Sequence, residues 1–285
     1  MEINICKIIP NNYFGEHSQV FDEMEVATTS AFKNLGHTVI NSINEFRPNM
    51  KNLVFNMHQI PVDVARHLVP KGTIVYNFEQ IGLDSNRVEL NRWVKKYRGL
   101  EIWDYSKKNI EAYKRLGIPG LENTKYVPVG SSSEYVKFDR NPVKDIDILF
   151  FGQPGGRRER ILKELESNKN INFVMLHKVY GKERNDMIGR AKLVINTHSQ
   201  DTEILEMVRL SNLFMNKIPV LSERNPGTEV PDFMDDVILT ATHDNYVKTA
   251  LELIQKPHYL DQCAEVTYQR FVENPIDKFI AEALK

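Results

Sequence analysis

The sequence has 285 residues, enough for one large domain or two domains of ordinary size. Hydrophobic residues make up 41%, charged residues make up 26%, and the net charge is -1, so no field of the whole molecule draws it to nucleic acid or membrane. No apolar run approaches the roughly 18 residues that a transmembrane helix requires. The first residues have the pattern of a strand rather than a signal peptide. We therefore expect a cytoplasmic protein, in which Cys6 and Cys263 stay reduced.

Short apolar runs alternate with helical patterns along the first half of the chain. Strands are expected at residues 3–9, 38–40, 53–57, 73–77, 101–103 and 125–129, and helices at residues 20–35, 62–68, 87–97 and 107–116. Strands separated by helices are typical of βαβ units, which build a mainly parallel sheet with helices on both faces.

A loop-forming stretch at residues 130–144 interrupts this alternation, which then restarts. Strands are expected at 146–151, 172–176, 193–196, 219–222 and 237–239, and helices at 158–166, 184–191, 203–215, 245–255 and 259–272. We predict an N-terminal Rossmann-like domain over residues 1–130, a linker over 131–144 and a second Rossmann-like domain over 145–285. The fold class is α/β, with two Rossmann-like domains facing a cleft. Ligands of such sheets bind beyond the carboxyl ends of the strands.

The first strand of the second half runs into a glycine-rich turn and then a helix. Gly152 opens this turn, and Arg157 and Arg158 close it. Glycines let backbone N–H groups approach a ligand, the helix N-terminus adds partial positive charge, and arginines add forked donors. This combination suits a diphosphate, although an ordinary strand–helix turn with solvated arginines has the same pattern. The sequence here is neither a Walker loop nor GxGxxG.

The helix expected at 203–215 carries Glu206, Arg209 and Asn212 at a spacing of three residues. A carboxylate and an amide on one helical face can accept hydrogen bonds from ribose hydroxyls. A solvated Glu–Arg pair on a surface helix gives the same pattern.

Three segments in order resemble the donor domain of GT-B glycosyltransferases, of the "glycosyl transferases group 1" type. They are Asp147 to Gly152 with Arg157 and Arg158, then Ala191 to His198, then Arg209 to Glu223, and together they span about residues 145–255. The resemblance implies a nucleoside-diphosphate sugar as donor substrate, with no prosthetic group. It places the nucleobase near Lys178 and Tyr180. It also suits a last helix that crosses back to the N-terminal domain.

The sequence departs from that family at the residue that usually binds the donor ribose. The family's glutamate falls near Asn212 here, and Glu206 lies one turn earlier. Asn212 can still bind a hydroxyl as a neutral group, so both residues stay candidates.

The family resemblance assigns the acceptor to the N-terminal half. Glu16 and His17 follow its first strand, and either could act as the catalytic base, with Arg158 stabilising the leaving group. Residues 87–115 hold about nine lysines and arginines against four acidic residues, with aromatic residues between them. This basic patch could bind DNA or an acidic glycan, or could be a solvated helix face.

The sequence thus predicts a glycosyltransferase that acts on a glycan, a protein, a small molecule or a modified DNA base. No Asp-x-Asp motif is evident, so we expect metal independence. Transfer with retention and transfer with inversion of the anomeric configuration both stay open. The alternative is a non-catalytic module that binds a sugar nucleotide or nucleic acid. The missing GxGxxG argues against a nicotinamide enzyme.

Overall fold

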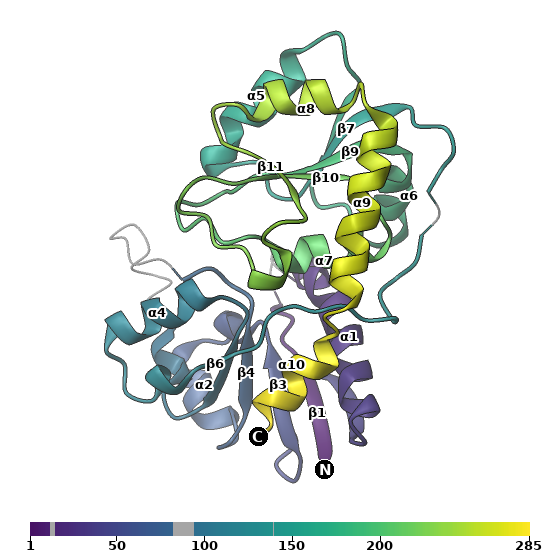
Figure 1. The fold of residues 1–285 in the computed structure, drawn as a ribbon. Helices are drawn as coiled ribbons and strands as arrows, with labels where there is room; N and C mark the ends of the chain where they lie inside the picture. The colour runs from purple at the N-terminus through teal and green to yellow at the C-terminus, as the bar shows by residue number, and fades with distance from the viewer. Residues whose placement is uncertain (12–14, 82–93, 139) are drawn as a thin grey trace. The chain divides into compact units, whose positions relative to one another are not determined.

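The computed structural model describes residues 1–11, 15–81, 94–138 and 140–285 (Figure 1). The chain divides into two compact units: residues Met1–Glu134 with Pro275–Lys285 form the first, and Tyr135–Asn274 form the second. Each unit has its own parallel sheet covered by helices. This arrangement confirms the predicted α/β class with two Rossmann-like halves.

The first unit is built on a six-stranded sheet with the order β2-β1-β3-β4-β5-β6. All its neighbouring strands are parallel. The strands are β1 (Glu2–Lys7), β2 (Thr38–Ile43), β3 (Lys51–Phe55), β4 (Ile74–Asn77), β5 (Glu101–Asp104) and β6 (Lys125–Tyr126). The α-helices are α1 (Asp22–Asn34), α2 (Val62–Leu68), α4 (Lys107–Leu116) and α10 (Ile276–Ala283), and the 3₁₀ turns are η1 (Glu16–Phe21), η2 (Met57–Gln59), η4 (Lys95–Tyr97) and η5 (Leu121–Asn123).

The central strands of this sheet are apolar because both of their faces are covered. In β3, for example, Leu53, Val54 and Phe55 are all fully buried. Helix α10, from the far end of the chain, packs beside α1 (Figure 1), and the Asn34 amide donates to Asp277 across a distance of 2.8 Å. The last residues of the sequence therefore complete the first unit.

The second unit is built on a five-stranded sheet with the order β11-β10-β9-β7-β8, again parallel throughout. Its strands are β7 (Ile146–Phe151), β8 (Phe173–Leu176), β9 (Ala191–Asn196), β10 (Val220–Glu223) and β11 (Leu239–Ala241). The α-helices are α5 (Glu159–Ser167), α6 (Gly181–Arg190), α7 (Met207–Met215), α8 (Tyr246–Leu253) and α9 (Pro257–Val272), and the 3₁₀ turns are η6 (Gly156–Arg158) and η7 (Asp232–Met234). One core cluster joins the sheet to α5 and α8, with the rings of Phe150 and Tyr246 fully buried in it.

Several predicted boundaries are wrong by a few residues. The helix predicted from residue 20 begins at Asp22, because a 3₁₀ turn precedes it. Strand β6 ends at Tyr126 rather than residue 129, since Pro128 has no N–H for a ladder. The helix predicted from residue 203 begins only at Met207. The preceding backbone is extended instead: Leu205 donates its N–H to the Glu229 carbonyl, and Glu229 donates back to Glu203.

Candidate functional site

The strand order of the second unit marks where a ligand is expected. From β7 the chain passes to β8 on one side, and β9, β10 and β11 then follow on the other side. The strand order therefore reverses between β7 and β9. Open α/β sheets bind ligands beyond the carboxyl ends of the strands at such a switch point. The two loops that meet there are residues 152–156 after β7 and residues 197–206 after β9.

Glycine is required where these two loops touch. Gly152 has a φ of 137°, and a Cβ on it would lie 2.9 Å from Arg209 Nη2. Gly156 has a φ of 69°, and a Cβ there would lie 2.2 Å from the carbonyl oxygen of Ser199. The N–H of Arg157 donates to that same carbonyl over 3.3 Å. A side chain at Gly156 would therefore separate the two loops, whereas one at Gly152 would displace the Arg209 side chain.

Arg157 is held by two carboxylates from different segments. Its Nη1 pairs with Glu203, and its Nη2 lies 2.8 Å from Glu223 Oε1 at the end of β10. The Asn225 amide donates to both carboxylates, over 3.0 Å to Glu203 and 2.9 Å to Glu223. The Glu223 side chain is fully buried, whereas that of Arg157 is 23% exposed. Arg157 therefore keeps one edge toward solvent.

Arg158 is buried beneath this turn and is only 3% exposed. Its Nη2 lies 3.3 Å from Glu206 Oε1, and its Nη1 donates to the Gln153 carbonyl over 3.2 Å. The guanidinium also lies over the ring of Phe150. Burial, with the neighbouring charge of Arg209, lowers the pKa of Arg158 to about 10. Arg158 is therefore still cationic at neutral pH.

Glu206 and Arg209 both lie beside this turn. Glu206 caps α7, and its Oε2 accepts from the Asn196 amide over 2.9 Å. Arg209 Nη1 donates to Asn196 Oδ1 over 2.8 Å. Burial acts to raise the pKa of Glu206, but contact with His198 and the charges of His198, Arg209 and Arg158 lower it to about 2. Glu206 is thus ionised in the folded protein.

His198 is fully buried in the same place, and the sequence pattern had predicted no role for it. Its main-chain N–H donates to Glu223 Oε2 over 3.0 Å, and its Nε2 lies 3.1 Å from the Glu223 carbonyl oxygen. Its Nδ1 lies 3.5 Å from Glu206 Oε2. Its place directly after β9, at a strand end, was the signal that could have identified it. We call the charged set at this switch point the switch-point cluster; it comprises Arg157, Arg158, Arg209, Glu203, Glu206, Glu223 and His198.

Unpaired polar atoms concentrate at this cluster. Over the described residues, seven buried side-chain nitrogen and oxygen atoms have no hydrogen-bond partner. Four of them lie in or beside the cluster: Arg158 Nε, Thr197 Oγ1, and the Nδ1 atoms of His198 and His243, which make no hydrogen bond but lie 3.5 Å from Glu206 Oε2 and 3.2 Å from Glu223 Oε1. Unsatisfied buried polar groups cost stability, typically about 1–3 kcal/mol each. Their concentration at a sheet's switch point makes this the place where a polar ligand would find unused donors.

The other residues predicted for donor binding divide into two groups. Lys178 and Tyr180 lie after β8, where Tyr180 caps α6, and His177 in that loop pairs with the Gln153 side chain over 2.8 Å. This loop therefore borders the glycine turn. Asn212 is only 5% exposed and accepts from the Asn216 amide over 3.0 Å. It shares no hydrogen bond with the switch-point cluster.

The first unit has a switch point of its own between β1 and β3. Glu16 and His17 lie in η1, which follows β1 in the chain; Glu16 is exposed and His17 half-buried. His58 lies in η2 directly after β3, with its Nε2 3.9 Å from Glu79 Oε1. Burial lowers the pKa of His58, against the opposing charge of Glu79. His58 was not predicted from the sequence, although it too follows a strand.

The predicted basic patch is only partly described: Arg87, Arg92 and Trp93 lie outside the described residues. Lys96 is not solvated, because its Nζ donates to the backbone carbonyls of His58, over 2.8 Å, and Ile60. Burial lowers the pKa of Lys96 to about 8. Tyr97 and Trp103 are fully buried. Neither aromatic ring is therefore free to stack on a base, and in the described part of the patch these aromatic residues belong to the core.

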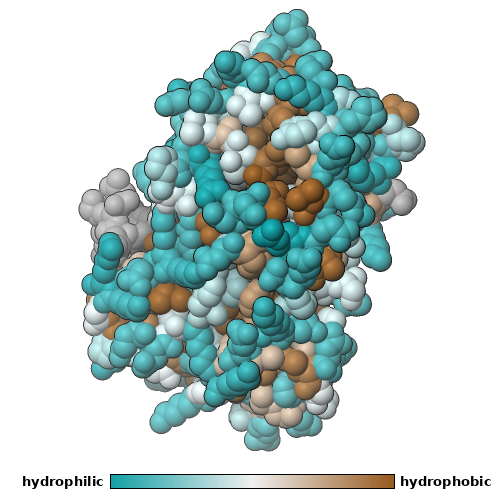
Figure 2. Space-filling model, in the orientation of Figure 1, coloured by the Kyte–Doolittle hydropathy of each residue, from teal (hydrophilic) through white to brown (hydrophobic). Residues whose placement is uncertain are grey.

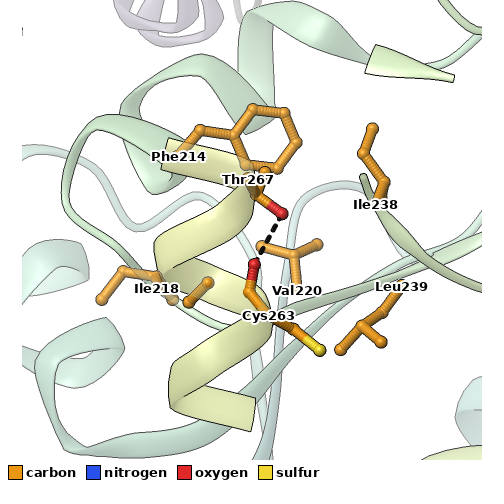
Figure 3. A pocket seen from close by; sticks show the side chains of 8 residues that line it. Phe214, Ile218, Val220, Ile238, Leu239, Cys263 and Thr267 are labelled. Carbon is orange, nitrogen blue, oxygen red and sulfur yellow. Dashed lines mark hydrogen bonds between the residues drawn. The ribbon is translucent and has the colours of Figure 1, made fainter. Parts of the chain in front are cut away.

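An apolar hollow lies elsewhere in the second unit, among α7, α9, β10 and β11. Figure 3 shows Phe214, Ile218, Val220 and Cys263 pointing toward it, with the Thr267 hydroxyl bound to the Cys263 carbonyl. On the face in Figure 2, apolar side chains gather over the part of this unit that contains these elements. No charged residue lines the hollow, so it lacks the groups that a phosphate requires.

Two kinds of site are absent from the described residues. No group of three histidine, cysteine, aspartate or glutamate side chains among them is placed to hold a metal ion. No described helix combines the length and apolar character needed to cross a membrane. Metal independence remains a prediction.

Comparison with known proteins identifies the fold. No family model matches the sequence. An uncharacterized protein of Acanthamoeba polyphaga mimivirus is 26% identical over 203 residues, which cover 67% of this chain and 64% of that protein's length. The structure of Anabaena HepE in complex with UDP-glucose matches with a TM-score of 0.62 at 11% identity, covering 100% of this chain and 99% of that chain. An α-glucosyltransferase in complex with UDP and a 13-mer DNA matches with a TM-score of 0.60 at 11% identity, covering both chains fully.

These similarities extend over both units, and they agree with the two parallel sheets described above. The chain therefore has the GT-B fold of glycosyltransferases along its whole length.

Proposed function

We propose that the chain is a glycosyltransferase whose second unit binds a nucleoside-diphosphate sugar beyond the carboxyl ends of β7 and β9. The observation that carries this proposal is the concentration of unpaired buried polar atoms at the switch point, among three arginines. Such atoms are few in folded proteins, and four of the seven in the described part of the chain lie in or beside this cluster. The glycine turn leads into the N-terminus of α5, whose partial positive charge also favours an anion.

The chemistry of transfer suits this set of charges. The bond between the anomeric carbon and the β-phosphate oxygen breaks, and the nucleoside diphosphate leaves with an additional negative charge. Guanidinium groups fixed in a partly buried site stabilise this charge without reorganising. We assign this role to Arg157 because its side chain is partly exposed. We assign it also to Arg158 and Arg209 because they lie directly behind the turn. The acceptor hydroxyl bonds to the anomeric carbon and gives its proton to a base.

The donor proposed for first tests is UDP-glucose, because the HepE structure contains it and the α-glucosyltransferase structure contains UDP. We place the diphosphate at the glycine turn and the nucleobase near Lys178 and Tyr180. Glu206 is a better ribose candidate than Asn212, since it belongs to the cluster whereas Asn212 is bound to Asn216.

We place the acceptor on the first unit, and two histidines there are candidates for the base. His17 was predicted from the sequence, together with Glu16. His58 Nε2 lies 2.8 Å from the side-chain amide of Gln59, which orients the ring, and the Glu79 carboxylate lies nearby at 3.9 Å. An oriented, neutral histidine at a sheet's switch point suits proton abstraction from a hydroxyl. DNA and acidic glycans stay possible acceptors, and the complex of the α-glucosyltransferase with DNA supports testing DNA.

A thermal-shift screen of nucleoside-diphosphate sugars tests the donor half directly. UDP-glucose or another member of the panel is expected to raise the melting temperature, and NAD is expected to leave it unchanged. Hydrolysis or transfer measured with the stabilising donor separates an enzyme from a non-catalytic module. Stabilisation by no member of the panel would contradict the proposal.

A further inference from the structure

The charge state of His198 determines the balance of charge in the switch-point cluster. Three guanidinium groups there face four carboxylates, because Asp201 also lies 3.6 Å from Arg157, and the His243 ring faces Glu223 over 3.2 Å. Protonation of the buried His198 ring adds one positive charge to this set. The ring is fully buried and surrounded by this cluster, so water does not screen it.

Both ring nitrogens of His198 face oxygen atoms that can only accept a hydrogen bond. Nε2 lies 3.1 Å from the Glu223 carbonyl oxygen, and Nδ1 lies 3.5 Å from the Glu206 carboxylate. A neutral imidazole carries one N–H and one lone pair. In either neutral tautomer the lone pair would therefore be directed at an oxygen atom. Only the doubly protonated ring suits both neighbours.

The charged groups around the ring also favour its protonated form. Glu206 faces it from the start of α7, Glu223 from the end of β10 and Glu203 from the loop between β9 and α7. Burial acts to lower the pKa of His198, but these three carboxylates outweigh it and raise the pKa. The arginines lie beyond the carboxylates: Arg158 contacts Glu206, and Arg157 contacts Glu223.

We propose that His198 is held as an imidazolium and serves as the internal counter-ion of Glu206, which leaves more of the arginines' charge available to a donor diphosphate. This role rests on the proposed function. His198 is a positioning residue, because it is buried behind the loop and acts through Glu206. When the ring loses its proton, Glu206 has only the arginines to neutralise it, and donor binding weakens.

The sign of the pH dependence follows from the raised pKa. The imidazolium is fully present below the ordinary histidine pKa of about 6.5, and it is lost as the pH rises through the raised value. Affinity for UDP-glucose is therefore expected to be constant near pH 6 and to fall about tenfold above the His198 pKa. UDP-glucose is the right probe, because its diphosphate is doubly esterified and keeps the same charge over this range.

Two measurements test the proposal. Nitrogen-15 NMR of the full chain reads the protonation of each histidine ring, and the His198 signal is assigned by its absence in His198→Gln. Should that variant fail to fold, the same signal is identified by the fall in its pKa in Glu206→Gln. Calorimetric titration with UDP-glucose between pH 6 and pH 8.5 gives the affinity. His258→Gln is the matched control, since His258 lies exposed on α9.

The expected result is a doubly protonated His198 at pH 7, with UDP-glucose affinity that falls with pH in the wild type and in His258→Gln but is weak and flat in His198→Gln. A neutral His198 ring at pH 7 overturns the proposal. UDP-glucose affinity that stays constant over the pH range in which the NMR signal shows His198 losing its proton overturns its role in donor binding. A protonated ring with no donor binding at any pH overturns the proposed function and that role, while the NMR result establishes the imidazolium separately.

Discussion

The contact between the glycine turn and the loop after β9 gives the sharpest prediction. Replacing Gly156 with alanine places a Cβ 2.2 Å from the Ser199 carbonyl oxygen, where ordinary contacts begin at 3.4 Å. The two segments must therefore separate by about 1 Å. The left-handed φ of 69° adds a cost of about 1–2 kcal/mol. Arg157 and Arg158 follow directly in the chain, so they move with the turn.

Moving a positioned group such as an arginine by about 1 Å can reduce the effect of that group up to about 100-fold. We expect Gly156→Ala to bind UDP-glucose about 10- to 100-fold more weakly, measured by calorimetry at a temperature where the variant is folded. Gly155→Ala is the matched control, because Gly155 has an extended backbone and no atom lies within 4 Å of the place where its Cβ would stand. Wild-type affinity in Gly156→Ala, or an equal loss in Gly155→Ala, would refute the placement of the diphosphate at this turn.

Other substitutions test the remaining assignments. Arg158→Gln should raise the Kd for UDP-glucose at least about tenfold by removing a buried cation, whereas Arg160→Gln should leave it unchanged because Arg160 is 58% exposed at its side chain; equal effects would argue against a specific role. Thr197→Val should weaken donor binding without lowering the melting temperature, since the Thr197 hydroxyl is buried and unpaired in the free protein; a large loss of stability would show that the hydroxyl is structural. His58→Gln should lower kcat about 100-fold or more with donor affinity unchanged, and His17→Gln should not; the reverse pattern would make His17 the base.

Local sequence patterns predicted much of the second unit. The apolar run that forms β7, the glycine turn and the following arginines lie next to one another in the chain, so their order alone indicates a strand, a tight turn and a helix. The spacing of Glu206 and Arg209 predicted a shared helical face; in the structure Glu206 lies just before α7, and both side chains bond to Asn196. The start of α7 was mispredicted because the pairing of Leu205 with Glu229 depends on a segment more than twenty residues away.

Aromatic residues show a second limit of local reasoning. Tyr97 and Trp103 lie among lysines and arginines in the sequence, a pattern that also occurs in nucleic-acid-binding surfaces. In the structure both are fully buried, and Trp103 lies 6.2 Å from Phe32 of α1, ring centre to ring centre. Sequence neighbours do not reveal such a partner, which comes from the packing of α1 against the sheet.

The sequence by itself determined the alternation of strands and helices, the two-fold division of the chain and the residue types that follow each strand, because these depend on neighbours within one turn or one strand. Only the tertiary structure decided which of those residues meet. His198 follows β9 and Glu223 ends β10, and they bond because these two strands lie side by side in the sheet. That strand order is a property of the packed sheet, so the partners of a buried charge cannot be deduced from its place in the chain.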